Sequence, residues 1–228
     1  MRPHFRLATL RQLGGWDAYN VTEDADIGVR LARRRLRVGT LASATRETAP
    51  TQLRPWMGQR TRWLKGWMQT FIVHNRNPAA LLRELGLTNF LLFETLVLGM
   101  IVTPFLHAAF LAVAAIQLAL GLPFWPGEFG WSALYGGFLA LGYGSAAAQT
   151  VLGLKRIGHL DLLANQILLP IYWLLMAVAT VQAMIELLGQ PFYWFKSPHA
   201  PVEPEGPGHR PAWFAKAAMG QRQPSPPA

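Results

Sequence analysis

The stretch FLLFETLVLGMIVTPFLHAAFLAVAAIQLAL, residues 90–120, decides the fold class of this chain. Glu94 is its only charged side chain, and about 20 apolar residues are enough for a helix to cross about 30 Å of hydrocarbon. Two further apolar stretches follow, over 131–154 without a charge and over 162–188 with Glu186 as the only charge. A chain of 228 residues with 14% charged residues has too little polar sequence to cover three such helices. The pattern therefore favours membrane helices over the buried helices of a soluble protein.

The basic charge of the chain is concentrated before these stretches. Residues 1–88 hold 15 Lys and Arg against 6 Asp and Glu, whereas residues 89–228 hold 6 of each. This uneven distribution argues against a uniformly basic nucleic-acid-binding protein, so we expect the lipid bilayer, and no nucleic acid, as a partner. The connector 121–130 has no Lys or Arg and the connector 153–161 has one of each. The positive-inside rule then predicts a multi-pass protein of the cell (inner) membrane with residues 1–88 in the cytoplasm.

Residues 1–88 show a mixed helix and strand pattern. The hydroxyl residue and two acids at 22–24 predict the start of a helix that runs to about Leu36. Val38–Ala42 is typical of a short strand, and a second helix is expected from about Pro55 to His74. We therefore expect an incomplete α/β domain over 1–88, followed by an α-helical transmembrane bundle over 89–190.

Two features are expected to carry no chemistry. The proline-rich tail, residues 191–228, is predicted to be disordered. His74, His107 and His159 have no metal-ligand spacing to one another, and the chain has no cysteine, so no metal site is predicted.

One face of the second helix carries residues suited to binding a sugar phosphate. Gln59, Arg62, Trp63 and Gly66 follow the spacing i, i+3, i+4 and i+7, so they share a face. A guanidinium group binds phosphate in a bidentate manner, and an indole ring can stack on a sugar ring. A basic amphipathic helix at the membrane surface explains the pattern equally well, through Trp56, Arg60, Trp63, Lys65 and Trp67.

The acids at the start of the first helix also have two interpretations. Glu23 and Asp24 suit a helix N-terminus because carboxylates stabilise the positive end of the helix dipole. A carboxylate there that faces a cleft is also suited to act as a general base. Asp26 is expected to be an exposed acid of the first turn.

The two motifs together resemble a known family. Thr22-Glu23-Asp24 lies about 35 residues before Gln59-Arg60-Thr61-Arg62-Trp63, and apolar stretches follow. This order resembles the membrane-embedded, cellulose-synthase-like kind of family 2 glycosyltransferase, whose TED and QxxRW motifs are matched letter for letter. Gly14–Asp17, Leu64–Trp67 and Pro191–Lys196 also look like that family, and the resemblance covers roughly residues 5–199.

The resemblance implies a function and roles for the residues. It implies inverting transfer of a sugar from a nucleotide-sugar donor to a polysaccharide or lipid-linked acceptor. Asp24 would be the general base, with Glu23 shaping its helix cap. Arg62 would hold the donor diphosphate, and Trp63 would stack under the acceptor sugar. Gln59 and Arg60 complete the substrate-binding residues that the resemblance implies.

The resemblance does not include the N-terminal half of the family's members. Its members bind the nucleotide, and a divalent metal such as Mg²⁺ or Mn²⁺, through an aspartate pair in an N-terminal half. Asp24-Ala25-Asp26 has the spacing of such a pair but belongs to the TED helix. We therefore expect that the chain starts inside a catalytic domain, binds no cofactor by itself, and does not use a nucleotide sugar productively alone.

Two other functional classes remain as alternatives. The first is a non-catalytic membrane protein whose basic helix binds anionic lipid or a partner protein. The second is a transporter, which is disfavoured because the apolar stretches lack paired charges.

Overall fold

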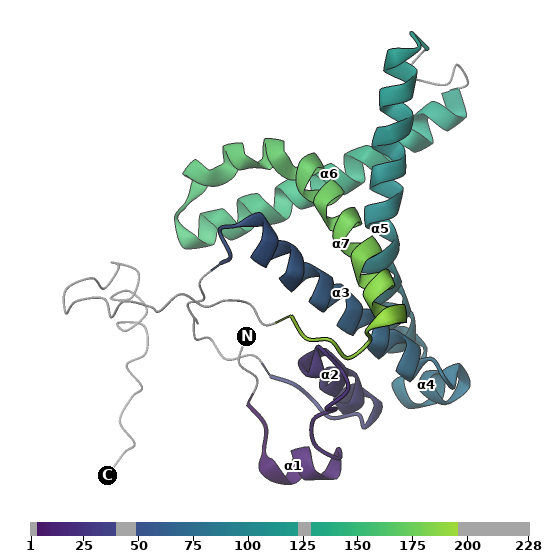
Figure 1. Cartoon of the computed structure of the whole chain (residues 1–228), viewed down its shortest axis with the longest axis vertical. Helices are drawn as coiled ribbons and strands as arrows, with labels where there is room; N and C mark the ends of the chain where they lie inside the picture. Colours follow the sequence, from purple (N-terminus) through teal and green to yellow (C-terminus); the bar gives the residue numbers. More distant parts are fainter. Residues whose placement is uncertain (1–3, 40–48, 123–128, 196–228) are drawn as a thin grey trace, which may run out of the picture. The chain divides into compact units, whose positions relative to one another are not determined.

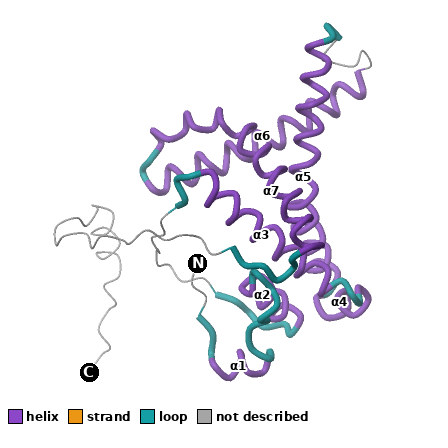
Figure 2. Tube along the Cα trace, in the orientation of Figure 1, coloured by secondary structure: helices purple, strands orange, loops and turns teal. Residues whose placement is uncertain are grey.

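The computed structural model describes residues 4–39, 49–122 and 129–195 (Figure 1). Every regular element in these ranges is a helix, as Figure 2 shows. Their bounds are α1 Leu7–Gln12, α2 Glu23–Arg33, α3 Leu53–His74, α4 Pro78–Leu85, α5 Leu87–Ala119, α6 Phe129–Ile157, the 3₁₀ helix η1 Leu160–Leu168 and α7 Leu169–Gly189.

The expectation of an incomplete α/β domain over residues 1–88 is wrong. No strand or sheet occurs in the part of the chain that the structure describes. Val38 and Gly39 have no regular structure, and the rest of the predicted strand, 40–42, lies outside the described residues. A short run of strand-forming residues becomes a strand only when another strand pairs with it. The described ranges offer it no such strand.

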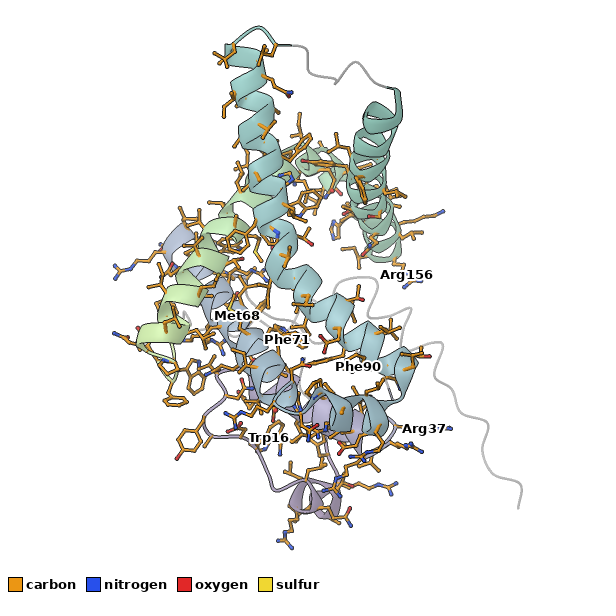
Figure 3. The ribbon with its side chains drawn as sticks, turned by 90° about the vertical axis from the view of Figure 1, so that its right-hand side faces the viewer. Trp16, Arg37, Met68, Phe71, Phe90 and Arg156 are labelled. Carbon is orange, nitrogen blue, oxygen red and sulfur yellow. The ribbon has the colours of Figure 1, made fainter. Side chains whose placement is uncertain are left out.

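Helix α3 packs against three other helices, α2, α5 and α7. Its buried Leu64 and Met68 form a cluster with Ala179 and Ala183 of α7. The small alanine side chains let the two backbones approach closely. In Figure 3, Met68 lies on the side of α3 toward α7. Phe71 stacks on Phe93 of α5, with ring centroids 6.0 Å apart.

The helices of the N-terminal part begin and end close to the predicted positions, with one addition. Helix α3 begins at Leu53, two residues before the predicted Pro55, and α2 ends at Arg33 instead of Leu36. Helix α4 was not predicted, although Asn77 and Pro78 carry its signal. The side-chain oxygen of Asn77 accepts a hydrogen bond from the backbone of Ala80 at 3.0 Å, and proline suits the first helical turn.

The three apolar stretches all form helices. Helix α5 covers the first stretch without interruption, with Pro104 inside it. Helix α6 covers the second, 131–154, and the third divides into η1 and α7 near Pro170. Proline lacks the N–H group that would continue the preceding turns, which explains the division.

Two segments in the described ranges are long and apolar enough to cross a membrane, Leu87–Ala119 and Leu160–Gly189. Helix α6 is not one of them. The predicted tail falls mostly on residues 196–228, which lie outside the described residues.

Candidate functional site

The loop before α2 is fixed to α3 by buried polar side chains. Asn20 donates from Nδ2 to Oγ1 of Thr70 at 2.9 Å, and its own Oδ1 accepts from the backbone of Thr22 at 2.9 Å. The backbone of Val21 donates to Oε1 of Gln69 at 3.2 Å. The bonds to Thr70 and Gln69 join residues 50 and 48 positions apart, so they set where α2 begins relative to α3.

Gly66 allows the closest contact between the two motifs. A Cβ atom added to Gly66 would lie 2.0 Å from Oγ1 of Thr22 and 2.6 Å from its Cγ2. Thr22 occupies the N-cap position of α2, but its hydroxyl makes no capping bond and instead contacts Oδ1 of Asn20 at 3.3 Å. The side chain of Thr22 therefore serves to pack α2 against α3.

Asp24 and Trp63 line the same cavity. Asp24 lies in the first turn of α2, its side chain is exposed, and its Oδ1 accepts from the backbone of Ala25 at 2.9 Å. The cavity has a volume of about 1160 Å³ and includes Trp67, one helical turn after Trp63. A carboxylate and two indole rings are thus placed around one space large enough for a substrate.

Arg62 lies close to two of the acids in the first turn of α2, Glu23 and Asp24. Its side chain is half-buried, and Nη1 donates to the backbone oxygen of Val21 at 3.2 Å. Burial lowers the pKa of Arg62, and the negative charges of Glu23 and Asp24 oppose that shift. The Nε of Arg62 is buried and has no hydrogen-bond partner among the described residues.

The other two predicted substrate-binding residues lie elsewhere on α3. The guanidinium of Arg60 stands over the ring of Trp63 at 4.5 Å and over that of Trp56 at 5.6 Å. Gln59 is half-buried and is not among the residues that line the cavity of Asp24. The structure therefore brings Asp24 and Trp63 to one cavity, whereas neither Gln59 nor Arg62 is among the residues that line it; Arg62 is close to the charge of Asp24.

Lys65 is not the surface cation that a membrane-surface helix requires. Its side chain is fully buried, and Nζ lies 2.9 Å from Oε2 of Glu186. Nζ also donates to the backbone oxygens of Tyr193 at 2.7 Å and Gln190 at 3.3 Å. The sequence pattern does not pair these two residues, although Glu186 is the single charge of its apolar stretch. A carboxylate in an apolar stretch needs a partner that donates hydrogen bonds, so Glu186 by itself indicates a buried donor elsewhere in the chain.

Gln69 joins the loop before α2 to the segment after α7. Its Nε2 donates to the backbone oxygen of Pro191 at 3.0 Å, while its Oε1 accepts from Val21. In the same segment, the ring of Trp194 lies 5.7 Å from Cζ of Arg62. Residues 190–194 therefore lie against the two predicted motifs.

Asp26 is buried, so the expectation that it is exposed is wrong. It accepts from Nε2 of His74 at 3.0 Å and from Nε of Arg30 at 2.7 Å. Burial alone would raise the pKa of Asp26, but the bond from His74 and the charge of Arg30 outweigh it and hold the pKa below its usual value. Nη1 of Arg33 lies 2.9 Å from Nδ1 of His74, and a guanidinium can only donate. Nδ1 of His74 is therefore the acceptor, and Nε2 carries the hydrogen that is donated to Asp26.

The divalent metal that the resemblance implies finds no fitting set of residues here. Within residues 4–39, 49–122 and 129–195 there is no group of three or more His, Asp or Glu side chains that could hold a metal ion. Asp26, the second acid with D-x-D spacing, is bound by His74 and Arg30. The described residues therefore do not fit the metal site that the resemblance implies.

The family described as glycosyl transferase family group 2 matches residues 4–127, which include both motifs and all of α5. No curated protein and no solved structure matches the chain.

Proposed function

Because the chain belongs to glycosyl transferase family group 2, we propose that it forms the acceptor side of a site that transfers a sugar from a nucleotide-sugar donor to a hydroxyl group of a polysaccharide or lipid-linked acceptor, and that it does not transfer the sugar alone. The observation that carries this proposal is the cavity shared by Asp24 and Trp63. Arg62 lies close to the charges of Glu23 and Asp24, although it is not among the residues that line the cavity. A base, a stacking surface and a phosphate-binding group are the parts that such a transfer requires.

In the proposed reaction Asp24 accepts the proton of the acceptor hydroxyl. The acceptor oxygen then forms a bond to the anomeric carbon of the donor, while the bond from that carbon to the diphosphate breaks on the opposite face. The nucleoside diphosphate leaves, and the guanidinium of Arg62 stabilises its negative charge. Trp63 stacks against the acceptor sugar, with Arg60 over its ring.

We place this site at the cytoplasmic face of a multi-pass inner-membrane protein. The support is that only 17% and 22% of the residues in the most apolar windows of Leu87–Ala119 and Leu160–Gly189 are buried. Large apolar side chains such as Leu106, Leu118 and Leu188 are at least 64% exposed. Contiguous apolar surface of this kind is unfavourable in water and is stabilised by lipid.

The test uses membranes from cells that express the full chain together with a nucleotide-binding domain of the same family. These membranes are incubated with a panel of radiolabelled nucleotide sugars, and incorporation into polymer and into lipid is counted. The expected result is that Asp24→Asn abolishes incorporation, because the amide cannot accept the hydroxyl proton. Asp161→Asn, at an exposed position at the start of η1, keeps incorporation unchanged. Equal incorporation by Asp24→Asn and the parent, or none from any donor, contradicts the proposal.

A further inference from the structure

The segment after α7 lies along one face of α3. Figure 1 shows it leaving the end of α7 and running back beside α3. The α3 residues that it contacts are spaced by three or four positions, so they share a face of the helix: Gly58, Arg62, Lys65 and Gln69. Phe195 leaves no room for a side chain at position 58, because a Cβ atom added to Gly58 would lie 2.6 Å from its ring. The segment is therefore held against α3 from Gln190 to Phe195.

The buried amide of Gln69 uses its acceptor and its donors. Oε1 accepts from the backbone N–H of Val21 at 3.2 Å. Nε2 donates to the backbone oxygens of Pro191 at 3.0 Å and Tyr19 at 3.4 Å. The reverse orientation of the amide would set its N–H groups against the N–H of Val21 and its oxygen against two carbonyl oxygens, so these contacts fix the orientation. One side chain thus joins the loop before α2 to the segment after α7.

Two side chains of α3 hold the backbone at Val21. Gln69 accepts its N–H, and Nη1 of Arg62 donates to its carbonyl oxygen at 3.2 Å. Val21 is followed by Thr22, the N-cap residue of α2, and Asp24 lies in the first turn of that helix. The side chain of Asp24 is exposed, so its position is set by the backbone that leads into α2 and not by packing around it.

We propose that Gln69 is a positioning residue of the transfer site, an inference that rests on the proposed function. Gln69 is not among the residues that line the cavity of Asp24, so it acts through the loop and not on the substrates. It fixes the backbone before Asp24 and ties it to the end of α7, which belongs to a segment long and apolar enough to cross a membrane. The general base and this helix thus keep one relative position. A displacement of a catalytic group by about 1 Å can lower a rate by about 10²-fold.

The first test compares Gln69→Met with Gln12→Met in the same sugar-incorporation assay as Asp24→Asn. Methionine is similar to glutamine in length, but it has no N–H group and only a weak acceptor. Gln12, the last residue of α1, is exposed, so its variant is the matched control. Gln69→Met should lower kcat by about tenfold or more and leave KM for the nucleotide sugar within about twofold, because Asp24 is displaced while Arg62 keeps its place on α3. Gln12→Met should change neither.

The second test requires no sugar transfer. Hydrogen exchange of the purified full chain in lipid nanodiscs is measured for peptides that cover residues 19–24 and 190–195. Gln69→Met should raise exchange in both segments, because each opens more easily when its bond to Gln69 is lost. Gln12→Met should leave exchange in both segments unchanged.

Thermal unfolding checks that Gln69→Met folds, and Gln69→Glu replaces it if that variant unfolds. The carboxylate of Gln69→Glu still accepts from Val21 but has no hydrogen to donate to Pro191 or Tyr19. Exchange should then rise in 190–195 and change less in 19–24. Equal increases in the two segments, or none, would contradict the separate bonds assigned to the two ends of the amide.

Three results would overturn the positioning role. A folded Gln69→Met with the kcat of the parent shows that Asp24 does not depend on this side chain. A rise in KM without a fall in kcat places Gln69 in substrate binding. A lowered kcat with unchanged exchange in 19–24 shows that Gln69 acts by another route. If the parent itself incorporates no sugar, the proposed function fails, while the exchange data still show whether Gln69 ties the two segments.

Discussion

The ammonium group of Lys65 lies 2.9 Å from the carboxylate of Glu186, a residue 121 positions later in the chain. The Lys65 side chain is 0% exposed, and that of Glu186 is 22% exposed. Backbone oxygens of Gln190 and Tyr193 accept the other bonds of Nζ. One buried cation therefore holds the end of α7 and the segment after it against α3, the helix that carries Arg62 and Trp63.

Removal of Lys65 alone is expected to destabilise the protein strongly. Lys65→Met leaves the carboxylate of Glu186 and two backbone oxygens without their donor, and breaking a buried pair in this way costs about 3–5 kcal/mol. Denaturant unfolding in detergent, followed by circular dichroism, measures the change in the free energy of unfolding.

The double variant Lys65→Met with Glu186→Gln is the informative comparison. It removes both charges, so it should recover a large part of the lost stability. Lys155→Met near the end of α6, where the side chain is exposed, serves as control and should change little. A Lys65→Met variant as stable as this control would show that the pair has no structural role.

Two helical glycines are expected to respond to alanine in opposite directions. Gly66→Ala places Cβ 2.0 Å from Oγ1 of Thr22, so α2 must move away from α3, and overpacking of this kind costs ~1–3 kcal/mol. Gly28→Ala meets no atom within 4 Å, and it should stabilise α2 by about 0.5–1 kcal/mol because it lowers the backbone entropy of the unfolded chain. Unfolding midpoints of both variants measure the two changes in stability, and changes of the same sign would contradict the close packing of Gly66 against Thr22.

Sequence patterns predicted the long helices well because their signal is local. The apolar run at 90–120 corresponds to α5, Leu87–Ala119, and α3 begins within two residues of the expected position. The expected strand at Val38–Ala42 rested on the residue types alone. A strand also depends on a partner strand, and a single short segment carries no information about one.

The buried charges could not be located from sequence because their partners are distant in the chain. Asp26 looks like an exposed acid of a first turn, yet His74, 48 residues later, buries and binds it. Lys65 looks like part of a basic surface until Glu186 is placed beside it. The spacing of Gln59, Arg62, Trp63 and Gly66 did predict a shared face. It did not show that, of these four residues, only Trp63 lines the cavity that contains Asp24.

Acid is expected to destabilise the protein through Asp26. The pKa of Asp26 is held below its usual value, so the stability that this carboxylate contributes is complete above about pH 4 and is lost as the pH falls through the lowered pKa. The Asp26→Asn variant lacks this titration, so its stability should change less between pH 7 and pH 3.

The same variant should be less stable at pH 7. Arg30 and His74 lose a charged acceptor in Asp26→Asn, and such a loss costs about 1–3 kcal/mol. Asp161→Asn, with an Asp side chain that is 71% exposed, is the control. Unfolding curves at several pH values give both quantities, and parallel pH profiles for Asp26→Asn and the parent would contradict the role of Asp26.

Lysine is expected to replace Arg62 poorly, even though the charge is kept. The Nη1 of Arg62 donates to the backbone oxygen of Val21, and this uses one of the five N–H groups of the guanidinium. The guanidinium can therefore bind the loop and a diphosphate at the same time, whereas one ammonium cannot reproduce this planar geometry. Arg62→Lys should lower kcat/KM for the nucleotide sugar by about tenfold or more, which corresponds to about 1.4 kcal/mol of transition-state stabilisation.

Arg54→Lys, in the exposed first turn of α3, should leave kcat/KM unchanged. Equal values for Arg62→Lys and Arg54→Lys would remove Arg62 from the donor site.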